Sequence, residues 1–188
     1  HYTTVVAAER ARLNVIEVPH SGYPEFKIDV NEYIPLIEKH NPKLILLTYP
    51  DGNYGNLPYA TRLGEIAREY DVPYMLNGAY AVGRMPMSME NIGADFIVGS
   101  GHKSMASAGP CGVLGMKKKW EDVVLRKSVA YSKKEIEPLG CTLRGVPLVT
   151  LMASFPYVTE RIRHWGEQVS KAQWFSDELQ KLGFKQLG

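Results

Sequence analysis

The stretch "DFIVGSGHKSMASAGPCGVLG", Asp95 to Gly115, places a lysine in a loop of small residues directly after an apolar segment. "DFIVGS" (95–100) predicts a buried strand, and "CGVLGM" (111–116) predicts another strand after the loop. A partly desolvated lysine at the end of a strand, here Lys103, is suited to act as an amine nucleophile. A solvated lysine on a surface loop is the other interpretation, and this segment alone leaves both open.

Strands and helices alternate along the rest of the chain. The sequence predicts helices at 4–13, 31–40, 57–70 and 120–127, and a long helical region at 149–182 with a break near Gly166. Apolar segments predict further strands at 14–19, 43–50 and 72–77, whereas residues 133–147 read as irregular. This alternation predicts an α/β fold, with a mainly parallel sheet and helices on both faces.

Three turns rich in polar residues follow predicted strands: "YPDGN", "NGAY" and "SGHK". The carboxyl ends of parallel strands meet at one edge of a sheet, which is where ligands bind in such folds. The sequence therefore predicts one site that gathers the side chains of all three turns.

Composition limits the classes of protein to consider. The 188 residues carry a formal net charge of +2, which is too small to indicate nucleic-acid binding by itself. Cys111 and Cys141 fit neither a zinc pattern nor a disulfide framework, so we expect free thiols in a reducing cytoplasm. No apolar run is long enough to span a bilayer, and the chain opens on His1. We therefore expect a soluble, cytoplasmic part of a longer chain.

Four segments in register resemble the fold-type I pyridoxal 5'-phosphate (PLP) enzymes, in the branch that contains cysteine desulfurases. They are "HYTT", "YPDGNYGNLP", "MLNGAYAVGRMP" and "SGHKSMASAGPCGVLG". Together with "GCTLRGVPLVTLMASFPYV", the second and third resemble the archaeal Sep-tRNA:Cys-tRNA synthase family. The resemblance implies a seven-stranded type of sheet and makes residues 1–188 the PLP-binding large domain. An upstream glycine-rich segment and a C-terminal small domain then lie outside this chain.

The resemblance implies roles for the residues of the lysine loop. Lys103 would form the Schiff base with PLP and move protons at the α-carbon of the substrate. His1 would stack on the ring and assist proton transfer. Ser100 and His102 would contact the cofactor phosphate, with hydrogen bonds inside the loop as the alternative.

The resemblance implies that the turn after the first long strand supplies a partner for the phenolic oxygen of the cofactor. The resemblance favours Asn53 for this contact, and Asp51 or Asn56 would serve if the turn is set differently. Tyr80, where desulfurases have a glutamine, is expected to contact the same oxygen.

Asn77 departs from the desulfurase pattern, which has an aspartate that keeps the pyridine nitrogen protonated. An asparagine can hydrogen-bond this nitrogen but supplies no full charge, so the ring is a weaker electron sink. A good leaving group such as phosphate on the β-carbon compensates. We therefore expect Asn77 to favour β-elimination over transamination, with a purely capping role at the strand end as the alternative.

The irregular stretch contains Cys141 and Arg144, and the resemblance places it at a dimer interface. A cysteine near an arginine can have a lowered pKa, so Cys141 is a candidate persulfide carrier, with inert packing as the alternative. Arg144 is a candidate phosphate ligand from the other subunit or a surface arginine. Cys111 is expected in the core.

The resemblance implies conversion of O-phosphoseryl-tRNA(Cys) to cysteinyl-tRNA(Cys) by loss of phosphate and addition of sulfur. The implied partners are the tRNA, a sulfur donor or sulfide, a second copy in a homodimer and a phosphoseryl-tRNA synthetase. Basic clusters at 117–119, 126–127 and 133–134 face either tRNA phosphates or only solvent. The alternatives are a cysteine desulfurase, an amino-acid decarboxylase, or a non-catalytic sulfur-relay or tRNA scaffold.

Overall fold

The computed structural model describes residues 2–127, 129–130, 134–136 and 145–186. Its main sheet has four strands in the order β1-β2-β3-β4. Strands β1 (Ile45–Thr48), β2 (Tyr74–Asn77) and β3 (Phe96–Ser100) run parallel, and β4 (Gly112–Met116) runs antiparallel to β3. The α/β class is therefore confirmed, and the sheet is mixed.

Strand β4 reverses direction because the chain returns to the sheet without a full crossover helix. Between β3 and β4 lies only α5 (Gly101–Ser104), a single turn, followed by a short loop. The amide of Gly101 donates to the carbonyl of Cys111 at 2.7 Å, which closes this connection at its base. Parallel strands need a longer connection than this, so the antiparallel pairing follows.

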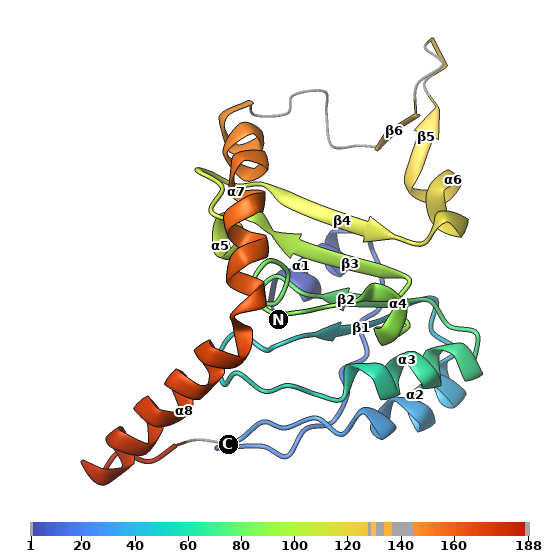
Figure 1. Cartoon of the computed structure of the whole chain (residues 1–188). Coiled ribbons are helices and arrows are strands. Elements are labelled where there is room, and N and C mark those ends of the chain that lie inside the picture. Colours follow the sequence, from blue (N-terminus) through green and yellow to red (C-terminus); the bar gives the residue numbers. More distant parts are fainter. Residues whose placement is uncertain (1, 128, 131–133, 137–144, 187–188) are drawn as a thin grey trace.

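Two helices form the main core with the sheet. They are α2 (Tyr33–His40), which follows the short helix η1 (Val30–Glu32), and α3 (Ala60–Glu69). Tyr74, Leu76 and Leu47 point from their strands into this core and are at most 1% exposed. Figure 1 shows α2 and α3 lying side by side along the β1 edge of the sheet, while α1 (Tyr2–Arg10) lies behind it.

A second, smaller core joins the lysine loop to the C-terminal helices. Met105, Leu151 and Val158 are buried together, and Val82, Cys111 and Val113 pack against them. Leu151 and Val158 lie on α7 (Gly145–Arg163), which stands beside α5 in Figure 1 and continues into α8 (Trp165–Lys181). Cys111, which was expected in the core, is only partly buried and packs against this smaller core.

Three local predictions are wrong. Residues 14–19 form no strand, because the described residues give them no neighbouring strand to pair with, and Val15 and Ile16 are each 42% exposed. The helix expected at 120–127 is η2 (Lys118–Trp120) and α6 (Glu121–Val124), after which β5 (Leu125–Lys127) pairs with β6 (Lys134–Ile136). The third is the irregular reading of residues 133–147, which contain the strand β6 and the start of α7.

The predicted break in the long helical region is confirmed. It falls at His164, between α7 and α8 and two residues before Gly166.

The remaining short helix is α4 (Met89–Ile92), which is capped by the Ser88 side chain. Among the residues that the model describes, no helix combines the length and apolar character that a membrane crossing requires.

Candidate functional site

The carboxyl ends of β1, β2 and β3 lie next to one another, as the sequence predicts. Thr48 on β1 is in register with Asn77 on β2, which is in register with Val98 on β3. Beyond the strands the pairing continues, because the Tyr49 amide donates to the Asn77 carbonyl at 2.9 Å and the Gly78 amide donates to the Val98 carbonyl at 2.9 Å. The three polar turns are therefore assembled at one edge of the sheet.

Lys103 lies on α5, one turn beyond the end of β3, with its amino nitrogen 3.9 Å from the centroid of the Tyr80 ring. The predicted partial desolvation of this lysine is wrong, since the side chain is exposed. The buried side of α5 is taken by Gly101 and Ser104, which leaves Lys103 on the outer side. The aromatic ring, rather than burial, positions the amine.

Tyr80 also fits tightly against the turn that follows β1. A Cβ atom at position 52 would lie 2.6 Å from Cε2 of Tyr80, so Gly52 is required for this close approach. On its other side, the backbone carbonyl of Tyr80 accepts a hydrogen bond of 3.4 Å from the Ser104 hydroxyl. Tyr80 thus connects the turn after β1 to the lysine helix.

Ser100 and His102, the two predicted phosphate contacts, bond to each other. The Ser100 hydroxyl lies 3.2 Å from Nδ1 of His102. This contact is the hydrogen bond inside the loop that the sequence offered as the alternative to phosphate binding. It occupies only one of the two ring nitrogens of His102, whose imidazole is exposed. The pair keeps a hydroxyl and a ring nitrogen next to the lysine turn.

Asn77 is half-buried at the end of β2, and its side chain is oriented by the backbone. Its Oδ1 accepts a hydrogen bond of 3.2 Å from the Ala79 amide. The capping role that the sequence left open is therefore real. It uses the oxygen of the amide and leaves the Nδ2 group available as a hydrogen-bond donor.

In the turn after β1, the three candidate residues have different hydrogen-bonding roles. The Asp51 carboxylate accepts hydrogen bonds from the amides of Asn53 and Tyr54, each at 2.9 Å, and from the Asn56 amide at 2.7 Å. The Asn56 side chain donates to the Glu25 carbonyl at 2.8 Å. Asp51 and Asn56 therefore hold the turn, and the exposed side chain of Asn53 remains for a ligand.

Side chains on one face of α7 hold the lysine loop, a role that the sequence did not predict. The Arg161 guanidinium donates to the carbonyls of Gly83 and Ser104, and the Ser154 hydroxyl donates to the Met105 carbonyl. Two more bonds join the same partners: Ser107 to the Pro147 carbonyl and the Ala108 amide to Thr150, each at 2.9 Å. Positions 147, 150, 154 and 161 share one face of a helix, and this spacing was the available signal.

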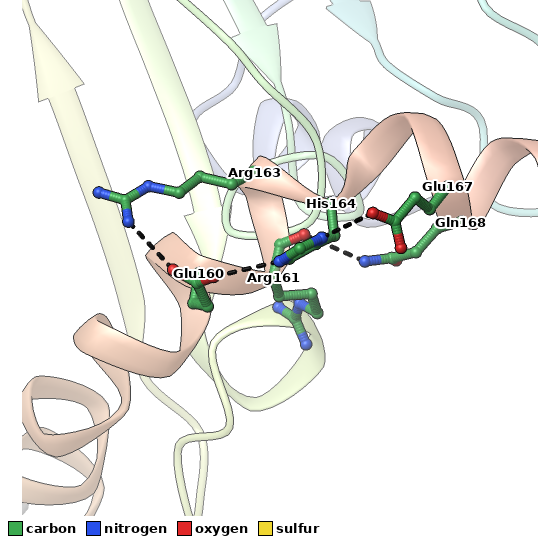
Figure 2. A network of polar contacts seen from close by, with 6 residues as sticks. All are labelled: Glu160, Arg161, Arg163, His164, Glu167 and Gln168. Carbon is green, nitrogen blue, oxygen red and sulfur yellow. Dashed lines mark hydrogen bonds and ion pairs between the residues drawn. The ribbon is translucent and has the colours of Figure 1, made fainter.

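Figure 2 shows the junction between α7 and α8. Nδ1 of His164 is paired with Glu167 at 2.9 Å and its Nε2 with Glu160 at 3.1 Å. The Arg161 side chain points away from this network, and its backbone carbonyl accepts a hydrogen bond of 3.1 Å from Gln168. The junction thus fixes both helices beside the residue that contacts the lysine loop.

Two lysines of the basic cluster at 117–119 lie at the edge of the sheet opposite to the candidate site. Asp95, which immediately precedes β3, is 5% exposed and pairs with Lys119 at 2.9 Å and with Lys117 at 3.4 Å. Burial raises the pKa of Asp95, but hydrogen bonds from Lys119 and the Tyr74 amide outweigh it and hold that pKa below its usual range. Lys117 and Lys119 therefore have a structural partner in Asp95.

His1, Cys141 and Arg144 lie outside the described residues.

The fold of this chain places it in a structural class, and the sequence comparisons then place it in a family. The chain is similar to the apo structure of cysteine desulfurase from Thermococcus onnurineus NA1, with a TM-score of 0.71 and 20% identity, over 96% of this chain and 50% of that chain. The fold of this chain is thus of the cysteine-desulfurase type.

The family follows from the sequence comparisons. The model of the family described as O-phosphoseryl-tRNA(Sec) selenium transferase, SepSecS, matches residues 1–181, and the chain belongs to this family. It is 56% identical to the O-phospho-L-seryl-tRNA:Cys-tRNA synthase of Methanosarcina mazei and 52% identical to that of Methanocaldococcus jannaschii. Both comparisons cover 100% of this chain, and 50% and 52% of the relatives, so the chain spans about half their length.

A solved crystal structure of a SepCysS-SepCysE N-terminal domain complex contains a chain of nearly the same fold. The TM-score is 0.93 at 52% identity, over 100% of this chain and 52% of that chain. The expected membership in the synthase group is confirmed by these comparisons.

Proposed function

We propose that the complete protein converts O-phosphoseryl-tRNA(Cys) to cysteinyl-tRNA(Cys) with PLP as its cofactor. The observation that carries the proposal is the 56% identity, over the whole chain, to a relative that is named for this activity. The sheet edge supports it independently, because a lysine amine, an asparagine amide and a hydroxyl–imidazole pair are brought together there.

The donor set at the sheet edge fits PLP. The cofactor has an aldehyde, an anionic phosphate, a phenolic oxygen and a pyridine nitrogen, and each needs a different partner. The Lys103 amine suits the aldehyde, and the Ser100 and His102 pair suits the phosphate. The Nδ2 group of Asn77 is a donor for the pyridine nitrogen, and the Asn53 amide for the phenolic oxygen.

When bound, PLP supplies an electron sink for negative charge that develops at the substrate α-carbon. The Lys103 amine takes the α-proton, and the electrons of that bond form a double bond between the α- and β-carbons. The bond from the β-carbon to oxygen breaks, and phosphate leaves with its electrons. Hydrosulfide then bonds to the β-carbon, and Lys103 returns a proton to the α-carbon.

Further roles concern residues outside the described part of the chain. We propose His1 as the group that stacks on the cofactor ring and assists proton transfer. Cys141 is proposed to carry a persulfide sulfur, whose S–S bond a thiol reductant must cleave after transfer. Arg144 is proposed to bind a phosphate across a homodimer interface.

The proposed partners are the charged tRNA, a sulfur donor or sulfide, and a second copy of the chain, in the cytoplasm. A phosphoseryl-tRNA synthetase is proposed as a further partner, because it would supply the substrate. The SepCysE domain that is bound in the similar structure adds a candidate that the sequence did not suggest. Residues 1–188 are proposed as the PLP-binding large domain.

The experiment gives the complete protein, with PLP, three substrates in parallel: O-phosphoseryl-tRNA(Cys) with sulfide, free O-phosphoserine with sulfide, and free cysteine. The proposal predicts cysteinyl-tRNA from the first and no sulfide from the third. Release of sulfide from free cysteine would instead identify a desulfurase, and decarboxylated product a decarboxylase. A protein that binds tRNA and forms no product would be a scaffold.

A further inference from the structure

An exposed group of aromatic rings lies beside the candidate site and has no part in either core. It consists of His20, Tyr23, Phe26 and Tyr54, which we call the aromatic cluster. Phe26 and Tyr54 are stacked, with ring centroids 4.7 Å apart at an angle of 28°. Tyr23 meets Phe26 edge-on at 6.3 Å, and His20 lies 5.2 Å from it. Tyr23 is 83% exposed and Tyr54 is 39% exposed.

The cluster is built by two turns that hydrogen bonds hold together. The Asn56 side chain donates to the Glu25 carbonyl at 2.8 Å, which ties the turn after β1 to the loop at 20–27. That loop is closed by bonds from the Phe26 amide to the Gly22 carbonyl and from the Lys27 amide to the Ser21 hydroxyl, at 2.8 and 2.9 Å. The rings are therefore held in place and not merely exposed.

Phe26 has a backbone φ of 51°, in the left-handed region that a bulky residue rarely adopts. Such a conformation costs energy and persists only where the surroundings impose it, which makes it a pointer to function. Here the conformation allows Phe26 to stack against Tyr54.

A series of contacts connects the cluster to the lysine. The Lys103 amine lies over the Tyr80 ring, and Tyr80 packs against Gly52, two residues before Tyr54. In an aminoacyl-tRNA, the amino acid is esterified to the ribose of the terminal nucleotide. The last base of the tRNA must then lie near the lysine loop, and the turn that carries Tyr54 adjoins that loop through Tyr80.

We propose that the aromatic cluster stacks the terminal base of the tRNA and so positions the amino acid at Lys103. This inference rests on the proposed function. Every nucleobase has a π-face that stacks on aromatic side chains. Lys27, the cation in this loop, is paired with Glu25 at 3.7 Å, which favours recognition through ring faces over recognition of a phosphate.

The test compares wild-type complete protein with Tyr54→Leu, Tyr54→Phe and Tyr23→Leu, and uses Tyr157→Leu as control. Tyr157 is 79% exposed on α7 and belongs to no ring pair of the cluster. Loss of stacking predicts that Tyr54→Leu raises the KM for O-phosphoseryl-tRNA about fivefold or more, with kcat within about twofold. Tyr54→Phe and Tyr157→Leu keep the wild-type KM, and Tyr23→Leu shows a smaller rise.

A binding assay without turnover separates this inference from the proposed function. Uncharged tRNA(Cys) with and without its terminal adenosine is titrated against wild-type protein and Tyr54→Leu, with PLP bound. Wild-type protein should bind the intact tRNA more tightly, and Tyr54→Leu should bind both alike. An unchanged KM in Tyr54→Leu, or an equal loss of affinity for both tRNAs, would overturn the inference. Lack of cysteinyl-tRNA synthesis by wild-type protein would overturn the proposed function, while this assay still reports on the cluster.

Discussion

The amino nitrogen of Lys103 lies over the ring of Tyr80, 3.9 Å from its centroid, although the lysine side chain is exposed. The ring packs closely against Gly52, and the backbone carbonyl of Tyr80 accepts a hydrogen bond from the Ser104 hydroxyl. The amine is therefore restrained by a contact between two of the three turns at the sheet edge. This contact joins the turn after β2 to the lysine helix.

Replacing Tyr80 tests that contact. An exposed cation–π contact contributes roughly 0.5–1 kcal/mol, so its loss in Tyr80→Leu should weaken PLP binding about two- to fivefold through lost restraint of the amine. Tyr80→Phe keeps the ring and loses only the hydroxyl that is expected to contact the phenolic oxygen, so it should weaken PLP binding less than Tyr80→Leu does. Titration of the complete protein with PLP, followed by its visible absorption band, measures both. Equal weakening in the two variants would show that the hydroxyl, rather than the ring face, matters.

Asn77→Asp changes the partner of the pyridine nitrogen with little change in shape. Aspartate keeps an oxygen that can accept from the Ala79 amide, as Asn77 does at 3.2 Å, but adds a negative charge. The charge should strengthen the electron sink and so increase transamination relative to loss of phosphate. Transamination keeps the phosphate on the β-carbon, so the ratio of 3-phosphonooxypyruvoyl-tRNA to cysteinyl-tRNA measures the partition. An unchanged ratio would mean that Asn77 only caps the strand.

Arg161→Met tests the hold of α7 on the lysine loop. The change leaves the carbonyls of Gly83 and Ser104 without this donor, and an unsatisfied buried polar group costs about 1–3 kcal/mol. We expect a lower free energy of unfolding in urea and weaker PLP binding. Arg163→Met, two residues along the same helix, removes an exposed pair with Glu160 and should change neither. Similar losses in both variants would contradict a specific role for Arg161.

The junction in Figure 2 predicts a pH dependence of stability. Hydrogen bonds to Glu167 and Glu160 raise the pKa of His164 above its ordinary 6.5, and the same bonds lower the pKa of both carboxyls below 4.5. The raised histidine pKa stabilises the fold fully below pH 6.5, and this is lost as the pH rises through the folded-state pKa. The lowered carboxyl pKa values stabilise it above pH 4.5, and this is lost as the pH falls through them.

The measurement is the difference in unfolding free energy between wild-type protein and His164→Gln across this range. The difference should be largest between pH 4.5 and 6.5 and should shrink on either side. A difference that does not vary with pH would show that the three side chains are not coupled in solution.

Much of the fold was predictable because apolar runs and turn residues act locally. The runs around Leu47, Leu76 and Val98 are strands, and their carboxyl ends do meet at one edge. The direction of β4 was not predictable from its own residues, because it depends on how α5 closes onto Cys111. The strand expected around Val15 does not form for a similar reason, because a strand needs a neighbouring strand in space and its own residues do not show whether one is there.

In the candidate site, too, some features could be predicted from the sequence and others depend on contacts between distant segments. Asn53, Asn77 and Lys103 were named as candidates because their segments resemble those of PLP enzymes, and each lies at or soon after the end of a strand. The exposure of Lys103 and its contact with Tyr80 depend on the packing of one turn against another. Arg161 was missed because the helical spacing of positions 147, 150, 154 and 161 indicates a shared face but not its partners, which for Arg161 are backbone carbonyls.

The central claim is that Lys103 is the amine that binds the cofactor, and chemical trapping tests it most directly. Complete protein loaded with PLP is reduced with borohydride, digested, and mapped by mass spectrometry. A pyridoxyl group on the peptide that contains Lys103, and its absence in Lys103→Ala, is the predicted result. The label on another lysine such as Lys117, or cysteinyl-tRNA synthesis by Lys103→Ala at the wild-type rate, would contradict the account.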